Sequence, residues 1–127
     1  MGTFRQEIEL AARPEGPFQR IDALVDTGAT YTSVPASVLQ QLGVVPVDSE
    51  TFIMADGTQI ERPVGETVTR LDGRTRTTMV IFGDEGSQSL LGAMTLEAFS
   101  MAADTRNPRL VRVPGYLTPQ QAQARDP

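Results

Sequence analysis

Residues 23–29 read Ala23-Leu24-Val25-Asp26-Thr27-Gly28-Ala29, and this stretch decides how the rest of the chain is interpreted. Its apolar residues predict a strand that ends at Asp26, and Gly28 lets the backbone turn sharply beside the carboxylate. A partly desolvated carboxylate can hold an unusual protonation state, which acid–base catalysis on a water molecule requires. The tripeptide Asp26-Thr27-Gly28 occurs once in the chain. A site that needs two such carboxylates therefore needs a second copy of the chain.

The composition excludes many kinds of catalysis. The chain contains no His and no Cys, and all 11 of its basic residues are Arg. This excludes His-based triads, Cys nucleophiles, CxxC redox motifs, common zinc sites, Lys Schiff bases and the P-loop lysine. Carboxylates are the strongest general acid–base candidates that remain. The sequence predicts no metal and no organic cofactor.

Length and charge predict one domain that does not bind nucleic acid. At 127 residues the chain is too short for two domains, so we expect one domain over residues 1–117 and a disordered polar tail over residues 118–127. The net charge of −5 argues against a nucleic-acid partner. No apolar run reaches membrane-spanning length. The absence of Cys suits the reducing cytoplasm, where we expect the protein, although the sequence leaves open an upstream anchor in the native protein.

The pattern of apolar residues predicts an all-β fold with one or two short helices. Strands are predicted over residues 3–12, 18–25, 44–54, 74–82, 90–92 and 110–113. Helices are predicted over Pro35–Leu42, which Gly43 ends, and over Thr95–Phe99. An apolar strand, a glycine turn and a short helix thus occur twice, at residues 23–42 and 89–99.

Two Asp-Gly pairs predict tight hairpins. Asp56-Gly57 and Asp72-Gly73 each lie between strand-like runs, and Asp-Gly is a strong hairpin signal. The arginines beside the second pair, Arg70, Arg74 and Arg76, are most simply interpreted as a solvated face.

In this order and spacing, the motifs resemble those of the single-domain, homodimeric retropepsin-type aspartic peptidases, in their bacterial form. The resemblance covers about residues 18–114 and rests on the loop 23–29, the segment Met54-Ala55-Asp56-Gly57-Thr58 and the run Leu90-Leu91-Gly92 with its following helix. The ending from Ala103 to Val111 is similar to the closing strands of bacterial members. The resemblance implies a small closed β-barrel with a flap hairpin. It also implies an aspartic endopeptidase that hydrolyses extended polypeptides as a homodimer, with one catalytic Asp per chain.

The resemblance also implies a role for each motif. Asp26 would face its counterpart across a two-fold axis, and the two carboxylates would share a proton. Thr27 would form a hydrogen bond across the dimer, Gly28 would turn its N–H toward the carboxylate, and Ala29 would complete the loop. Residues 54–58 would form a flap that binds substrate. Leu90 and Leu91 would wall the catalytic loop, and Gly92 would let the chain pass closely beside it.

One departure from the viral pattern concerns the dimer. Retroviral members usually carry an acidic residue shortly after the catalytic loop and an Arg after the second glycine, and these two side chains pair. Here the corresponding residues are Thr30 and Ala93. Both partners are missing together, so no unpaired buried charge remains. The dimer is therefore expected to be braced differently or less tightly.

Other interpretations of these motifs remain open. The Asp26 loop could be a structural turn in which the side chain caps its own backbone. The segment around Asp56 could be a hairpin that any β domain needs, and Leu90 and Leu91 would be core residues in almost any fold. The main alternative function is a non-catalytic retropepsin-like barrel that binds peptides or mediates protein assembly. A glycosidase has little support, because glycosidases use a pair of carboxylates and the motifs here supply only one per chain.

Overall fold

The computed structural model describes residues 3–122, and residues 1–2 and 123–127 lie outside this part of the chain. Strands alternate with two short helices along the sequence. The strands are β1 (Phe4–Ala11), β2 (Gln19–Val25), β3 (Ser33–Pro35), β4 (Asp48–Ile53), β5 (Gln59–Leu71), β6 (Arg74–Gly83), β7 (Leu90–Leu91), β8 (Met101–Asp104) and β9 (Arg109–Arg112). The helices are α1 (Ala36–Leu42) and α2 (Ala93–Ala98). The prediction of an all-β fold with short helices is confirmed.

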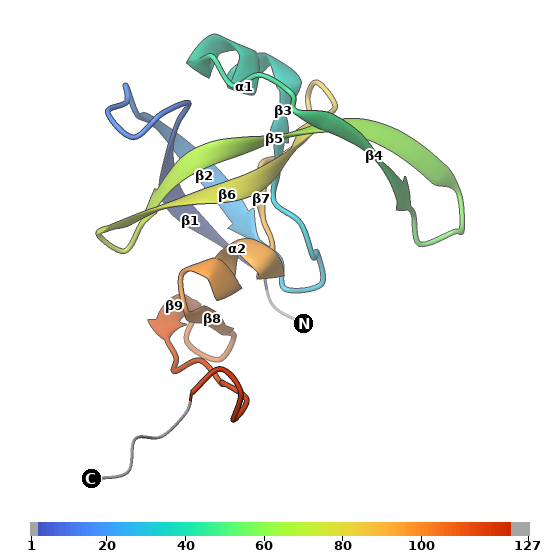
Figure 1. Cartoon of the computed structure of the whole chain (residues 1–127). Helices are drawn as coiled ribbons and strands as arrows, with labels where there is room; N and C mark the ends of the chain where they lie inside the picture. Colours follow the sequence, from blue (N-terminus) through green and yellow to red (C-terminus); the bar gives the residue numbers. More distant parts are fainter. Residues whose placement is uncertain (1–2, 123–127) are drawn as a thin grey trace, which may run out of the picture.

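Seven of the strands form one sheet in the order β1-β2-β7-β3-β6-β5-β4. A further antiparallel pairing between β1 and β5, from Glu9 with Arg70 to Ala11 with Val68, closes six of these strands into a ring. The seventh strand, β4, pairs with β5 and extends the β4–β5 hairpin away from the ring (Figure 1). The remaining strands, β8 and β9, form a separate two-stranded sheet beneath α2.

The core fills the ring because the strands alternate as expected for half-buried β structure. In β2, Ile21, Ala23 and Val25 are buried, whereas their neighbours are more accessible. Helix α1 adds Leu39 to the core, and α2 with its C-terminal neighbour adds Leu96 and Phe99. Burial of these apolar side chains stabilises the ring, and it places the end of β2 at the edge of a packed core.

The helix ends follow the sequence signals in part. Pro35 precedes α1, and Gly43 ends it in the left-handed conformation with φ of 90°, as predicted. The second helix begins at Ala93, two residues before the predicted start, directly after Gly92. Strand β4 is also shorter than predicted, because it begins at Asp48 and not at Val44.

The prediction of a solvated arginine face beside the β5–β6 hairpin is wrong for two of its three members. Arg74 is half-buried and donates a hydrogen bond to the carbonyl of Phe99, at the C-terminal end of α2. Arg70 is also half-buried and lies over the ring of Phe18, 3.8 Å from its centroid. The third arginine, Arg76, is exposed.

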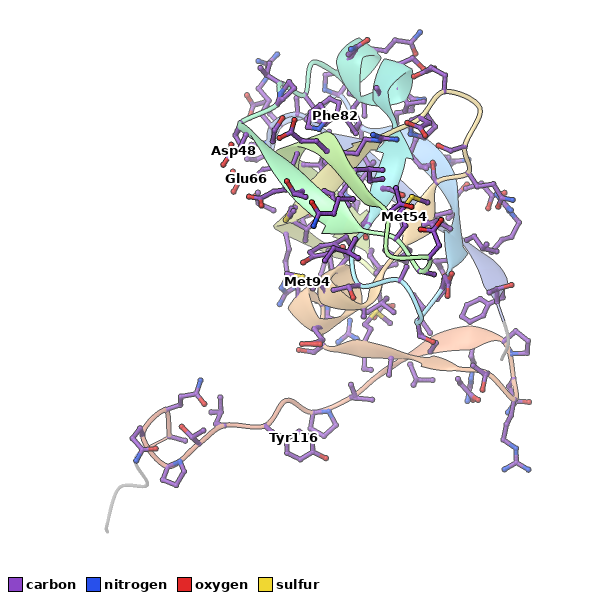
Figure 2. The ribbon with its side chains drawn as sticks, turned by 90° about the vertical axis from the view of Figure 1, so that its right-hand side faces the viewer. Asp48, Met54, Glu66, Phe82, Met94 and Tyr116 are labelled. Atoms are coloured by element: carbon purple, nitrogen blue, oxygen red, sulfur yellow. The ribbon has the colours of Figure 1, made fainter. Side chains whose placement is uncertain are left out.

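The chain after β9 is extended and leaves the rest of the protein. Figure 2 shows Tyr116 on this segment, well apart from the sheet. Residues 118–122 of the predicted tail form a turn in which the N–H groups of Gln121 and Ala122 lie 3.0 and 3.1 Å from the carbonyl oxygen of Thr118. The rest of the predicted tail lies outside the described residues. Between residues 3 and 122, no helix has the length and apolar character needed to cross a membrane.

Candidate active site

The loop that follows β2 fixes one oxygen of the Asp26 carboxylate. The backbone N–H of Asp26 donates to the carbonyl of Leu91 at 3.2 Å, which anchors the end of the strand. The N–H of Gly28 donates to Asp26 Oδ1 at 3.0 Å, as the sequence predicted. The N–H of Ala29 closes the turn on the Asp26 carbonyl at 3.0 Å. Asp26 is half-buried, whereas Thr27 and Gly28 are exposed. The loop therefore presents an oriented carboxylate at an open surface.

The second apolar run lies directly beside this loop. Strand β7 pairs in parallel with β2, so that Leu90 aligns with Leu24 and Leu91 with Val25. The two segments that share a strand–glycine–helix pattern are thus neighbours in space. Leu91 is fully buried, and Leu90 is half-buried. Leu90 and Leu91 thus lie beside the Asp26 loop, and their role as the wall of a catalytic loop stays a prediction.

At Gly92 the two segments approach each other very closely. A Cβ atom placed on Gly92 would lie 2.5 Å from both the carbonyl carbon and the oxygen of Tyr31, and 2.9 Å from the oxygen of Thr30. The next two N–H groups, those of Ala93 and Met94, donate to the carbonyls of Ala29 and Thr30, each at 2.9 Å. The position requires a glycine, because any side chain would push the two backbones apart.

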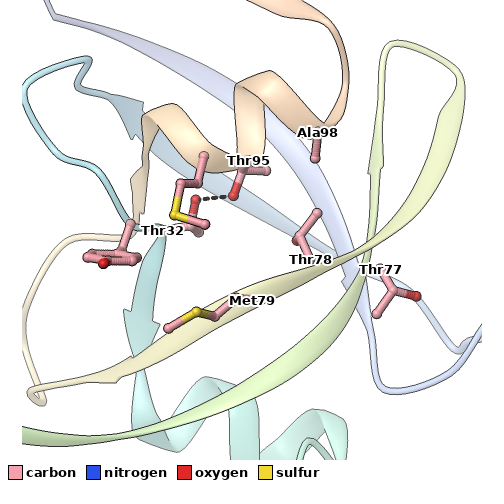
Figure 3. A pocket seen from close by; sticks show the side chains of 8 residues that line it. Thr32, Thr77, Thr78, Met79, Thr95 and Ala98 are labelled. Carbon is pink, nitrogen blue, oxygen red and sulfur yellow. Dashed lines mark hydrogen bonds between the residues drawn. The ribbon is translucent and has the colours of Figure 1, made fainter. Parts of the chain in front are cut away.

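A buried threonine pair links the same two segments, and the sequence did not predict it. The hydroxyl oxygens of Thr32 and Thr95 lie 2.6 Å apart (Figure 3). Thr32 Oγ1 also accepts the N–H of Gly92 at 3.0 Å. Both threonines are buried. Their hydrogen bonds satisfy polar groups that would otherwise be buried without partners. The sequence signal is weak, because a threonine is equally common on exposed strand faces.

The β4–β5 hairpin ends in a tight turn at residues 54–58. The N–H of Met54 donates to the carbonyl of Thr58, and the N–H of Gly57 donates to the carbonyl of Met54, both at 2.8 Å. Gly57 has a φ of 89°. The carboxylate of Asp56 accepts the N–H of Thr58 at 2.9 Å, and this hydrogen bond lowers the pKa of Asp56. Asp56 therefore has the environment of a turn residue, which is the interpretation that the sequence favoured over a catalytic acid.

A groove of about 800 Å³ lies between the Asp26 loop and the hairpin. Residues 28–31 line one side of it and residues 51–54 the other, and Leu90 contributes to its lining. Of the predicted site residues, the groove thus brings together Gly28, Ala29, Met54 and Leu90. Asp26 itself does not line the groove, and neither do the turn residues 55–58 or the buried Leu91 and Gly92. Thr27 is exposed outside the groove, so its predicted bond across a dimer stays a prediction.

The groove has an aromatic contact on one side and an ion pair on another. The rings of Tyr31 and Phe52 meet edge to face with centroids 5.4 Å apart. Arg62 and Asp84 also line the groove and form an ion pair of 3.1 Å between guanidinium and carboxylate. The sequence did not predict any of these four residues as part of a site. The available signal was the position of Tyr31, two residues after Ala29. Across residues 3–122, no three carboxylates gather as they would around a metal ion.

Comparison with solved structures finds proteases of similar fold. The chain is 20% identical to the simian foamy virus (mac) protease, with a TM-score of 0.51 over 74% of this chain and 94% of that chain. It is 14% identical to the EIAV protease complexed with the inhibitor HBY-793, with a TM-score of 0.54 over 77% and 88% of the two chains. It is 17% identical to the retroviral protease-like domain of Ddi1 from Leishmania major, with a TM-score of 0.53 over 85% and 87%. At these identities the likeness shows a shared fold. No curated protein sequence matches the chain.

Comparison with protein families identifies one match. The family described as "gag-polyprotein putative aspartyl protease" matches residues 17–98, which is more than half of the chain. The match includes the Asp26 loop, the β4–β5 hairpin and the run from Leu90 to Gly92. The resemblance that these motifs indicated is therefore confirmed, and the chain belongs to the retropepsin-like aspartyl protease family.

Proposed function

We propose that this protein is an aspartic endopeptidase that hydrolyses extended polypeptides as a homodimer. The observation that carries the proposal is the Asp26 carboxylate, which the N–H of Gly28 orients at 3.0 Å, because Gly28 and Ala29 of the same loop line the groove of about 800 Å³. An extended peptide in this groove would pass beside the carboxylate and under the β4–β5 hairpin. Family membership supports a peptidase, and the geometry of the loop supports acid–base catalysis.

The proposal requires two chains because the sequence supplies one Asp-Thr-Gly loop. The exposed residues of this loop, Thr27 and Gly28, leave it accessible to an identical loop of a second copy. Two carboxylates that face each other closely cannot both ionise at low cost, so the pair shares one proton. The ionised Asp26 takes a proton from water while that water attacks the peptide carbonyl. The protonated Asp26 of the second copy donates its proton to the carbonyl oxygen.

The hairpin would act as the flap in this mechanism. Its tip carries Ile53 and Met54, which are exposed apolar side chains next to the groove. Closing over a bound peptide would cover these side chains and exclude water from the reacting carbonyl. In β4, Phe52 alone is partly buried, so the hairpin has few contacts that oppose its movement. The proposed substrate is therefore an extended segment that the flap can enclose.

The bracing of the catalytic loop within one chain differs from the ion pair of the viral pattern. The backbone hydrogen bonds from Ala93 to Ala29 and from Met94 to Thr30 hold the loop against α2. These bonds need no charged side chain, so the absence of the acidic residue and the Arg does not leave the loop unsupported. They act within one chain, and we therefore expect a dimer that dissociates more readily than the viral ones.

The proposal is tested by cleavage of a mixture of extended peptides followed by mass spectrometry. Asp26→Asn keeps the shape of the side chain and its acceptor for the Gly28 N–H, and it should abolish cleavage. Asp22→Asn is the matched control, because Asp22 is an exposed residue of the same strand, paired with Arg5 at 2.6 Å. Loss of this surface pair has little effect on stability, so the control should keep its activity.

The concentration dependence of the reaction gives a second readout. Specific activity should rise with protein concentration through the range in which the dimer forms, because the monomer is inactive. Equal cleavage by Asp26→Asn and the parent would contradict a catalytic Asp26. Binding of peptides without cleavage by the parent would favour the non-catalytic peptide-binding alternative.

A further inference from the structure

Two hollows of the protein meet at Tyr31. The first is the groove beside the Asp26 loop, and the second is a cavity of about 200 Å³ under α2. Among the residues that the structure describes, Tyr31 is the only one that lines both. Its side chain therefore forms the wall between the groove and the cavity.

The cavity behind this wall suits an uncharged side chain. Figure 3 shows Thr32 and Thr95 joined by their hydrogen bond, with Thr78, Met79 and Ala98 around the same space. The hydroxyls of Thr32 and Thr95 are occupied with each other, so they leave mainly methyl groups and methionine for contact. A cavity of roughly 150 Å³ is large enough for benzene. The space under α2 is large enough for an aromatic ring.

The wall is held in place from two sides. The ring of Phe52 packs against the ring of Tyr31 at 5.4 Å, with an angle of 70° between their planes. The backbone of Tyr31 is fixed by its close approach to Gly92 and by the neighbouring hydrogen bond from Met94 to Thr30. With the hairpin in this position, the ring of Tyr31 is restrained at both its backbone and its edge. Tyr31 then separates the cavity from the groove.

We propose that Tyr31 is a specificity-determining residue, which limits the size of the substrate side chain that the groove accepts beside the catalytic loop. This inference rests on the proposed peptidase function. Aliphatic side chains of moderate size fit against the ring of Tyr31 and the side chain of Leu90. Phe or Trp at the same substrate position would need the space that the Tyr31 ring closes off. The protein therefore cleaves peptides with Val or Leu at this position faster than peptides with Phe or Trp.

The test compares kcat/KM for peptides that differ at the one position that contacts Tyr31, which carries Val, Leu, Phe or Trp. Tyr31→Ala joins the groove to the cavity, and the ratio of kcat/KM for Trp over Val should rise at least about tenfold. Tyr31→Phe keeps the ring and should keep the parent ratio. Phe52→Ala removes the ring that packs against Tyr31. It should therefore raise the same ratio, by a smaller factor than Tyr31→Ala.

Two further variants keep the test decisive. Tyr31→Leu retains an apolar side chain and should give a smaller shift in the same direction, should Tyr31→Ala fold poorly. Ala98→Leu places a larger side chain in the cavity. Combined with Tyr31→Ala, it should reverse the gain for Trp. An unchanged Trp-over-Val ratio in folded Tyr31→Ala and Tyr31→Leu would overturn the inference.

A binding readout separates this inference from the proposed function. The affinity of the same peptides for the Asp26→Asn protein, measured by calorimetry, does not depend on catalysis. A parent protein that cleaves none of the peptides would refute the peptidase proposal. A Trp-over-Val affinity ratio that rises when Tyr31→Ala is added to Asp26→Asn would still support Tyr31 as the wall. An equal ratio with and without Tyr31→Ala would contradict it.

Discussion

Replacement of Gly92 by alanine should destabilise the protein at the point where its two glycine-containing segments meet. The added Cβ would lie 2.5 Å from the carbonyl carbon and oxygen of Tyr31. Ordinary contact between nonbonded heavy atoms is about 3.5 Å, so the two backbones must separate by roughly 1 Å. Three hydrogen bonds cross this junction, from the N–H groups of Gly92, Ala93 and Met94. A separation of this size would weaken all three.

The magnitude follows from these two effects. Overpacking of a tight site costs about 1–3 kcal/mol, and a buried hydrogen-bonding group that loses its partner costs a similar amount. We expect Gly92→Ala to lower the free energy of unfolding by about 3 kcal/mol, which is a large part of the roughly 5–15 kcal/mol typical of a domain. The melting temperature should fall by about 10 °C.

The assay is urea unfolding followed by circular dichroism at one fixed protein concentration, because dimer formation would add to the stability. Gly115→Ala is the control, since nothing lies within 4 Å of a Cβ added there. This control should change the free energy of unfolding by less than about 0.5 kcal/mol. A Gly92→Ala protein as stable as the parent would refute the reasoning, because the two segments could not then approach as closely as we describe.

Three further substitutions test the hairpin, the threonine pair and an ion pair. Gly57→Val should impair peptide cleavage more than folding, because φ is 89° at Gly57 but no atom lies within 4 Å of an added Cβ; parent activity in a folded variant would argue against a flap. Thr32→Val should lower the free energy of unfolding by about 2 kcal/mol in urea, because the Gly92 N–H loses its acceptor; an unchanged midpoint would contradict this. The hydrogen bond from Arg112 lowers the pKa of Asp72. The stabilisation from this pair is therefore fully present above the ordinary carboxyl pKa, and it is lost as pH falls through the lowered pKa of Asp72. Asp72→Asn should therefore flatten the acid side of the stability curve, and an equally steep fall would show that the pair does not stabilise the fold.

The local features of the fold were predictable from the sequence because their signals are local. The apolar run into Asp26, the Asp-Gly pairs and the glycine after α1 each specify a turn through residues that are adjacent in the chain. The sequence showed that a strand–glycine–helix pattern occurs twice, but it did not predict the parallel pairing of Leu90 and Leu91 with β2. Such signals suffice to predict the all-β class and the position of the Asp26 loop.

The features that the sequence did not predict depend on contacts between distant residues. Strand β3 has three residues, and its partners β6 and β7 lie far along the chain, so no periodic pattern marks it. Thr32 and Thr95 are separated by 63 positions, and each is polar enough to be interpreted as a surface residue. Arg74 donates a hydrogen bond to the carbonyl of Phe99, because the end of a helix leaves carbonyl groups without partners. The sequence of the β5–β6 hairpin alone does not indicate this contact.

The residues that line the groove could not be predicted from the sequence either. Its lining comes from the loop after β2, the hairpin and the strands β6 and β7, and only their folding brings Tyr31, Phe52 and Arg62 together. The sequence predicted the residues that carry the proposed chemistry and missed those that shape the space for a substrate. The former belong to short motifs, whereas the latter are set by packing.

The central claim is that two copies of the chain each supply one Asp26 to a shared site. It is tested most directly by mixing the parent protein with increasing amounts of Asp26→Asn at constant total concentration, and measuring peptide cleavage after the subunits have exchanged. If both carboxylates are required, mixed dimers are inactive and the total activity falls as the square of the parent fraction. An activity that falls in simple proportion to the parent fraction would mean that each chain acts alone, and it would contradict the shared site.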